Sequence, residues 1–422
     1  MKKKIFCFVI LFLPLITYSQ NLNGRFTSSF YTFERFDNNN TSETFIRTFQ
    51  SLNLNFNIGQ FSLRTRTGME TNLGKALDQD VRFRFYNLYL EGRELLGFAT
   101  LKVGRQPLFT PVAGGLFDGV NLKLTYGGIS LTGFYGGNVP AYQKLELTSD
   151  WANNYVLGGR FETFPFDFLK LGVSYIDKNY KADDYNTLRL NSDLDPVTVL
   201  IQSKSNQYKY VSGDIWFEIP SLFEISSRYE YDLNIMATSR IEVDGRFQIT
   251  DNIGLNGYYN YREPQIRYNS IFSVFNFGNS QEIEGGFDFR IPKIATFFGK
   301  FGYVKYRDEN SSRITVGATT EYGSISYRKN LGYAGELDGV SIYTARTFMD
   351  GFLTPSVGIS YTTYKLSKDA DTNNIISFLG GVNIRPWSKW SFDIQGQYFN
   401  NKIYKNDLRV LFKVNHLFNT NF

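Results

Sequence analysis

Basic residues recur at two-residue spacing in the first part of this 422-residue chain. Arg64 and Arg66 follow apolar Leu63, and Arg82 and Arg84 flank Phe83. Side chains two residues apart in a β-strand point to the same face, so this spacing gathers positive charge on one face. Rows of arginine and lysine along a wet passage favour anions. The candidate pore-lining residues are Arg47, Arg64, Arg66, Arg82, Arg84, Lys102, Lys123 and Arg160.

A second interpretation of these basic residues stays open. They would pair with carboxylates on the same face and simply hold the wall rigid. The corresponding positions between residues 224 and 290 already mix both signs: Glu224, Arg228, Glu230, Arg240, Glu242, Asp244, Arg246, Glu284, Asp288 and Arg290. The sequence therefore predicts a basic wall in the N-terminal half and a self-paired wall across from it.

Catalytic and metal chemistry lack the residues they need. The chain has one histidine, His416, and one cysteine, Cys7. Acid–base catalysis and zinc sites draw on a histidine beside other polar groups or on His/Cys clusters. The segment 369–380 begins like a calcium loop but lacks its central glycine and its closing glutamate. We expect no enzyme activity, no metal site and no cofactor.

The elements that carry the basic residues are expected to be two-faced strands. From Arg240 to Ile249, every even position is charged or amide and every odd position is apolar or glycine. The same alternation recurs along nearly the whole chain. Past the first residues there is no run of eighteen apolar residues, which excludes membrane-spanning helices. The pattern predicts an all-β fold, a transmembrane antiparallel up-and-down β-barrel with lipid outside and water inside.

A soluble β-sandwich array also fits alternation. It would require domain boundaries, and the sequence has none. Trp216, Trp387 and Trp390 lie near expected strand ends, where interfacial aromatic girdles occur. The chain ends with Leu417, Phe418 and Phe422, similar to the aromatic assembly signal of outer-membrane proteins. These features favour the barrel.

The first residues resemble a secretory signal peptide. Lys2, Lys3 and Lys4 precede the apolar run 5–16, and Thr17 and Ser19 fit a cleavage site, so we expect cleavage after Ser19. Residues 1–19 would be the signal and 20–422 one barrel domain. Without the three signal lysines, 45 basic residues become 42 against 40 acidic ones, a formal net charge of +2. This balance predicts no nucleic-acid partner.

Turn signals divide the barrel domain into 22 strands in the best division, with 18 to 22 compatible. Short turns alternate with long loops, as in outer-membrane barrels. An even strand number puts both chain ends on the periplasmic side. The first strand begins near Leu22, which leaves no room for the N-terminal plug of energised receptors. The expected turns and loops include turns at 164–165 and 385–386 and polar loops at 106–116 and 177–206.

One external loop is unusually apolar. Residues 107–117 carry no charge and include Leu108, Val112 and Leu116. Such a segment should not stand exposed to water. We expect this third external loop to fold inward and narrow the pore or to pack against the barrel mouth. The candidate constriction residues are Arg105, Pro107, Phe109, Phe117 and Asp118.

This region carries a family resemblance. Gly104-Arg105-Gln106, then Phe117-Asp118-Gly119-Val120 and the strand 121–126, resembles bacterial outer-membrane porins of the alginate-export and substrate-specific type. The match covers about residues 81–136. It implies a passive channel, commonly an arginine-lined conduit for anionic solutes or polysaccharide, with Arg105 and Asp118 as the hinge of the loop. The composition also suggests a Bacteroidota-like Gram-negative source.

The expected function is a porin-like outer-membrane channel for passive diffusion of small hydrophilic solutes, with a bias toward anions. The expected partners are outer-membrane lipid, these solutes, and the periplasmic chaperones and barrel-assembly machinery. One alternative stays open: a non-conducting outer-membrane barrel that serves as anchor or scaffold for surface or secretion machinery.

Overall fold

The computed structural model describes residues 20–36, 42–74, 81–108, 110, 114–139, 145–181, 184–192, 194–202, 206–264, 278–307, 309–332, 335–365, 369–401 and 407–422. The expected signal peptide, residues 1–19, and Phe109 lie outside these described residues. No helix in the described ranges is both long and apolar enough to cross a bilayer.

Nearly all of the described chain is β-strand. The strands are β1 Gln20–Phe36, β2 Ser42–Ile58, β3 Phe61–Asn72, β4 Arg82–Leu95, β5 Ala99–Leu108, β6 Gly115–Tyr126, β7 Ile129–Val139, β8 Tyr155–Phe166, β9 Leu169–Tyr180, β10 Tyr185–Leu190, β11 Pro196–Ile201, β12 Asn206–Ile219, β13 Phe223–Asp232, β14 Ala237–Thr250, β15 Ile253–Arg262, β16 Ser280–Ile291, β17 Ala295–Tyr306, β18 Glu309–Thr320, β19 Gly323–Leu331, β20 Gly335–Ala345, β21 Leu353–Lys365, β22 Asn373–Trp387, β23 Trp390–Asn400 and β24 Asp407–Asn421. A short 3₁₀ helix, Met349–Gly351, lies between β20 and β21.

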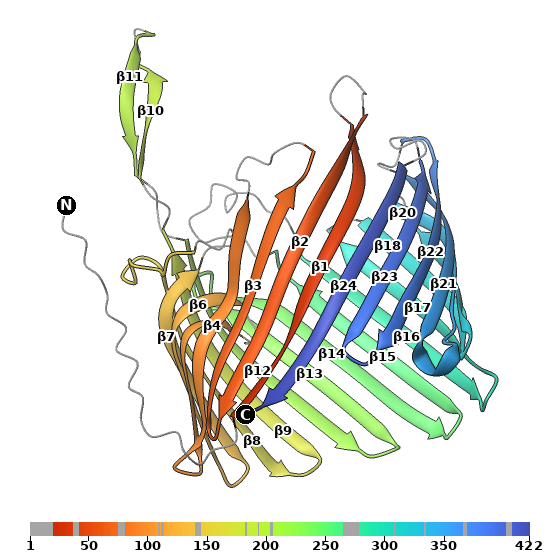
Figure 1. Ribbon diagram of the computed structural model, residues 1–422, viewed down its shortest axis with the longest axis horizontal. Coiled ribbons are helices and arrows are strands. Elements are labelled where there is room, and N and C mark those ends of the chain that lie inside the picture. The colour runs from red at the N-terminus through yellow and green to blue at the C-terminus, as the bar shows by residue number, and fades with distance from the viewer. Residues whose placement is uncertain are drawn as a thin grey trace.

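Twenty-two of these strands form one closed antiparallel barrel (Figure 1). Each barrel strand pairs with its neighbours in sequence, and β9 pairs with β12 across the inserted hairpin β10–β11. β24 closes the barrel onto β1, with Asn421 opposite Asn21. The prediction of an all-β up-and-down barrel with 22 strands is confirmed.

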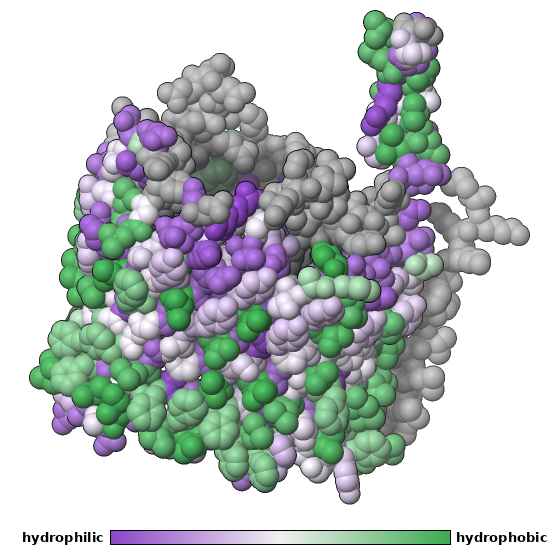
Figure 2. Space-filling model, turned by 180° about the vertical axis from the view of Figure 1, so that it is seen from behind, coloured by the Kyte–Doolittle hydropathy of each residue, from purple (hydrophilic) through white to green (hydrophobic). Residues whose placement is uncertain are grey.

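The two faces of each strand meet different surroundings. In β14, the odd-numbered Phe247 and Ile249 are exposed on the outside, and the even-numbered Arg240 and Arg246 make ion pairs inside. Exposed apolar side chains gather over the outer surface, densely toward the lower end in this view (Figure 2). We call the opposite, inward-pointing set of positions the lumen phase.

Connections differ between the two ends of the barrel (Figure 1). Most turns at one end are short, as at 59–60 and 127–128, and we call this the short-turn end; the other is the long-loop end. The start of β1 and the end of β24 both lie at the short-turn end, because Gln20 pairs with Ile58 beside a short turn. The turns expected at 164–165 and 385–386 lie at 167–168 and 388–389, since β8 and β22 continue past their prolines through register shifts.

The expected polar loop 177–206 is wrong in part. Its middle forms the hairpin β10–β11, which stands away from the barrel beyond the long-loop end (Figure 1). This hairpin follows the alternation typical of strands, with apolar residues at every second position: Leu188, Leu190, Val197 and Val199. The many polar residues around them made the segment resemble a loop.

Candidate functional site: the lumen wall

The basic residues predicted to line a pore all lie on the lumen phase of strands β2 to β8. Cross-strand register aligns them: Arg64 lies opposite Asn55, and Arg84 opposite Gly68, while Leu63 and Phe83 point outward. Lys102 lies opposite Glu91, and Arg160 pairs across β9 with Asp214 of β12. The two-residue periodicity of the sequence thus places these charges on one side of the wall.

Two carboxylates organise this wall, and each is shared by several cations. Glu70 lies 3.2 Å from Arg47 and 3.8 Å from Arg84. Neither cation is neutralised fully, because a single carboxylate carries one charge. Among the described side chains, the Glu70 cluster therefore keeps a net positive charge.

The second cluster is richer in cations. Glu91 lies 2.8 Å from Arg64, 3.2 Å from Arg93 and 3.5 Å from Lys102. Arg66 is close by in β3, with its guanidinium 5.1 Å from the Tyr86 ring. Cations of this wall are thus paired, as the pairing interpretation requires, and the described cations also outnumber the carboxylates that they share.

The wall formed by β13 to β18 is balanced instead. Arg228 and Arg240 alternate with Glu230 and Glu242, with Arg228 2.6 Å from Glu242. The other ion pairs on this wall join Arg246 to Asp288, Lys300 to Glu284, and Arg313 to both Glu282 and Glu284, so the paired cations and carboxylates are equal in number. Its charges cancel locally, as the mixed signs of the sequence predict.

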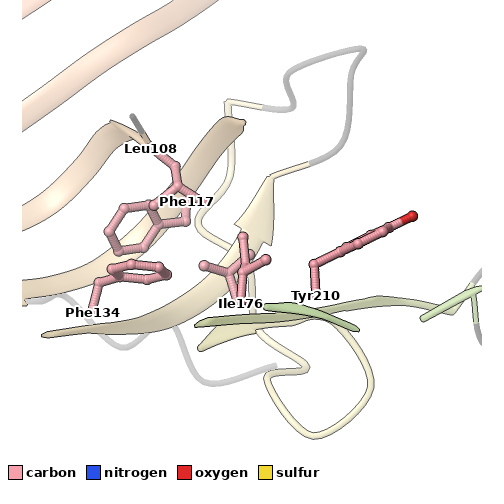
Figure 3. Packing of buried hydrophobic residues seen from close by; sticks show 6 residues of the cluster. Leu108, Phe117, Phe134, Ile176 and Tyr210 are labelled. Atoms are coloured by element: carbon pink, nitrogen blue, oxygen red, sulfur yellow. The ribbon is translucent and has the colours of Figure 1, made fainter. Parts of the chain in front are cut away.

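An apolar cluster interrupts the lumen phase near the long-loop end. It contains Leu108, Phe117, Phe134, Val156, Ile176 and Tyr210, from β5 to β9 and β12 (Figure 3). Phe117 is fully buried and its ring centroid lies 6.0 Å from that of Phe134. Apolar side chains on an aqueous wall are stable when another part of the protein covers them.

The end of the β5–β6 hairpin reaches across this wall. The Lys178 ammonium on β9 donates a hydrogen bond to the Gly114 carbonyl at 3.2 Å. β6 and β9 are three strand spacings apart, roughly 14 Å along a flat wall. A lysine side chain does not bridge that distance, so the hairpin end leans over the inner face of β7 and β8.

Three glycines permit this lean. Gly104, Gly119 and Gly136 lie side by side on β5, β6 and β7. Gly104 has a φ of +127°, and a Cβ on Gly119 would lie 2.6 Å from the Gly136 Cα. Side chains at these positions would hold the backbones apart, which explains why the Gly-Arg-Gln and Asp-Gly-Val segments contain glycine.

Arg105 and Asp118 lie on the outward face at the same level. The Arg105 guanidinium donates to both Asp118 carboxylate oxygens, at 2.7 and 2.9 Å, and both side chains are under 5% exposed. A segment between β7 and β8, residues 145–151, covers them from outside; we call it the strap. Thr148 donates its backbone N–H to Asp118 at 2.9 Å, and the Glu146 carbonyl accepts from Arg105 at 2.7 Å.

The strap is fixed by its own contacts. A Cβ on Gly137 would lie 2.7 Å from the indole nitrogen of Trp151, so the missing side chain at Gly137 leaves space for the Trp151 ring. Trp151 donates to the Thr148 carbonyl at 2.7 Å and packs edge-on against Tyr135. The Arg105–Asp118 ion pair is therefore buried between the strap and the outer face of β5 and β6. We call this buried pair, with its bonds to the strap, the latch.

The predicted loop 107–117 needs correction in its extent. Pro107 belongs to β5 and Phe117 to β6, so the strands continue to Leu108 and resume at Gly115. Arg105 and Asp118 lie in the strands and behind the wall, rather than at a loop hinge. Phe109 lies outside the described residues.

Sequence reasoning also misplaced one tryptophan. Trp216 lies on the lumen phase of β12, where its indole N–H donates to Glu224 at 3.2 Å. Trp216 follows Ser212 and Asp214 at two-residue spacing, so strand alternation would have placed it on the same face as these polar residues. Trp390, by contrast, stacks on His416 on the outer face, as expected for interfacial aromatics.

Shortening the leaning hairpin should widen the passage. We expect deletion of residues 110–114 to increase single-channel conductance, because the Gly114 contact with Lys178 and the cover over the inner wall are lost. A matched control deletes 186–200 of the hairpin β10–β11, which stands outside the barrel, and should leave conductance unchanged. Equal conductance of the 110–114 deletion and the parent would refute a constriction here.

Comparisons with known proteins inform the fold. No protein-family model matches the chain, and no curated protein does. Among solved structures, a mutant ferric enterobactin receptor (PfeA) of Pseudomonas aeruginosa is 10% identical, with 95% of this chain and 81% of that chain covered and a TM-score of 0.59. OccAB1 of Acinetobacter baumannii is also 10% identical, with 95% and 96% covered and a TM-score of 0.43. At such identity, the likeness to the receptor shows one thing: the chain has the fold of a large closed β-barrel.

Proposed function

We propose that this barrel is a porin-like channel for passive diffusion of small hydrophilic solutes. The observation that carries the proposal is the lumen wall: charged residues line it on strands β2 to β6, β8 and β13 to β18, inside a closed barrel whose outer face is apolar. Many of these charges keep partial exposure, such as 33% for Arg64 and 49% for Arg246, which suits a water-filled interior.

The location that fits this wall is a bacterial outer membrane. An even number of antiparallel strands, short turns at one end and exposed apolar side chains outside are features of such barrels. The secretion signal and the C-terminal aromatics support delivery by periplasmic chaperones and the barrel-assembly machinery. The chemistry proposed is conduction without catalysis.

A bias toward anions follows from the shared carboxylates. Glu70 and Glu91 each lie among two or three cations, so the wall of β2 to β6 attracts anions despite its ion pairs. The balanced wall across the lumen does not extend this attraction around the pore. The arrangement favours small solutes over a long polyanion of the alginate type.

One observation favours the scaffold alternative. The hairpin β10–β11 exposes Leu188, Leu190 and Leu200 by more than half of their surfaces. Exposed apolar strands of this kind suit contact with a partner protein. A scaffold of this type would hold a partner and pass no solute.

Vesicle swelling separates the two functions. Purified protein reconstituted into liposomes should admit glucose and gluconate, with gluconate entering faster than its size predicts. The two solutes match in size and differ in charge. Vesicles that admit neither solute would support the scaffold. Equal entry of glucose and gluconate would refute the anion bias and leave the channel proposal in place.

A further inference from the structure

The lumen wall contains a recess whose chemistry differs from the basic wall. It has a volume of about 630 Å³ and lies between β8, β9, β12, β13 and β14, toward the short-turn end. This volume falls within the roughly 300–1,000 Å³ of small-molecule sites. Its lining includes Arg160, Phe164, Lys170, Asp214, Trp216 and Glu242.

The charged groups of the recess satisfy one another. The Arg160 guanidinium donates two hydrogen bonds to Asp214, both 2.8 Å, and a further contact joins it to Glu162 at 3.0 Å. Lys170 lies 2.8 Å from the same Glu162. Arg228, which also lines the recess, lies 2.6 Å from Glu242. Three cations thus meet three carboxylates, and these charges leave no excess to hold an ion.

These pairs still offer hydrogen bonds. A carboxylate has about four lone-pair sites and a guanidinium five N–H groups, so a two-bond pair leaves further donors and acceptors. Arg160 is only 14% exposed, and the bidentate geometry holds it and Asp214 in fixed positions. The recess presents rigid donors beside rigid acceptors, an arrangement that suits neighbouring hydroxyl groups.

Aromatic rings complete the site. Trp216 points into the lumen with its N–H anchored on Glu224, and Phe164 is about half exposed. Large aromatic faces in water are unfavourable unless they are covered, and they bind apolar faces of ligands. The C–H face of a sugar ring combines an apolar surface with hydroxyl groups at its rim.

We propose that this recess, here called the Trp216 recess, is a binding subsite for an uncharged saccharide. It rests on the proposed function, since the solute would reach it through the lumen. The sugar ring would lie against Trp216, and its hydroxyls would bond to Arg160 and Asp214. The Trp216 recess therefore differs in preferred ligand charge from the Glu70 and Glu91 clusters, whose excess cations favour anions.

Calorimetry of the folded protein in detergent tests the subsite directly. The two probes are maltose and maltobionate, which match in size; maltobionate carries a carboxylate at its reducing end, where the sugar ring is open. The proposal expects saturable binding of maltose and weaker binding of maltobionate. Tighter binding of maltobionate would make the subsite anionic, and absence of maltose binding would overturn the proposal.

Substitutions then locate the site. Trp216→Ala should weaken maltose binding by roughly five- to tenfold, through loss of the aromatic face. Trp216→Phe keeps a ring and should retain most of the affinity, which guards against misfolding of the alanine variant. Trp390→Ala removes a tryptophan from the outer face and should leave the maltose affinity unchanged. Unaltered affinity in folded Trp216→Ala would place the sugar elsewhere and refute the subsite.

Failure of the channel and of the subsite can be told apart. Calorimetry requires a folded barrel and no conduction. A barrel that binds maltose but leaves vesicles tight would keep the subsite and remove the channel. A conducting barrel without maltose binding would do the reverse.

Discussion

Replacing Arg105 with alanine should destabilise the folded barrel by about 3–5 kcal/mol, the cost typical of breaking a buried ion pair from one side. Asp118 would remain under 5% exposed with the Thr148 N–H and hydroxyl as its neighbours and no guanidinium. The strap would also lose the bond from Arg105 to the Glu146 carbonyl. The measurement is reversible urea unfolding in lipid vesicles, followed by tryptophan fluorescence.

Two further variants separate a latch from an ordinary surface pair. Lys413→Ala removes a partly exposed pair with Asp393, 3.2 Å apart and 38% and 27% exposed, and should cost at most about 1 kcal/mol. Arg105→Met combined with Asp118→Leu should recover part of the lost stability, because no buried charge is then left alone. An Arg105→Ala variant as stable as Lys413→Ala would show that the latch contributes little.

Charge reversal on the basic wall should abolish its anion preference. In the triple variant Arg64→Glu, Arg82→Glu and Arg84→Glu, the Glu70 and Glu91 clusters lose two of their cations and gain carboxylates. The described side chains on the lumen phase of β2 to β6 include eight cations and two carboxylates, and three reversals remove six charge units, so the net charge falls from +6 to zero. The reversal potential under a salt gradient should therefore lose the sign of anion preference and move close to zero.

A charge-conserving swap provides the control. Arg246→Asp with Asp288→Arg exchanges one pair on the balanced wall, 2.9 Å apart, without changing net charge. It should keep the parental selectivity. The matching triple variant with glutamine removes half as much charge and should weaken anion preference without abolishing it. If the glutamate triple variant conducted with unchanged selectivity, these basic residues would not control the pore.

The barrel itself could be predicted from the sequence, because two-residue alternation determines which face each side chain takes. Arg64 and Arg84 lie where their phase puts them, and β24 closes on β1. The partner Glu70 shares that phase and was open to the same reasoning. Glu91 reaches the lumen phase through the register shift at Tyr86, which alternation does not reveal. Their sharing among several cations depends on strand register, which alternation alone does not supply.

The region around the constriction could be predicted only in outline. Its apolar composition indicated burial, and Phe117 is indeed buried. The lean of the hairpin depends on three glycines that register brings side by side, and the strap comes from a segment about 30 residues beyond Asp118. Such non-local contacts leave no periodic signal. For Trp216, two signals in the sequence conflict. Its place near a strand end predicts an interfacial girdle, and its alternation with Asp214 predicts the lumen, which is where it lies.

Single-channel recording in planar lipid bilayers tests the central claim most directly. The purified full barrel should insert and give stable conductance steps, with a reversal potential under a potassium chloride gradient that indicates chloride preference. Folded protein that inserts into the bilayer and stays electrically silent would contradict the account of this barrel as a channel.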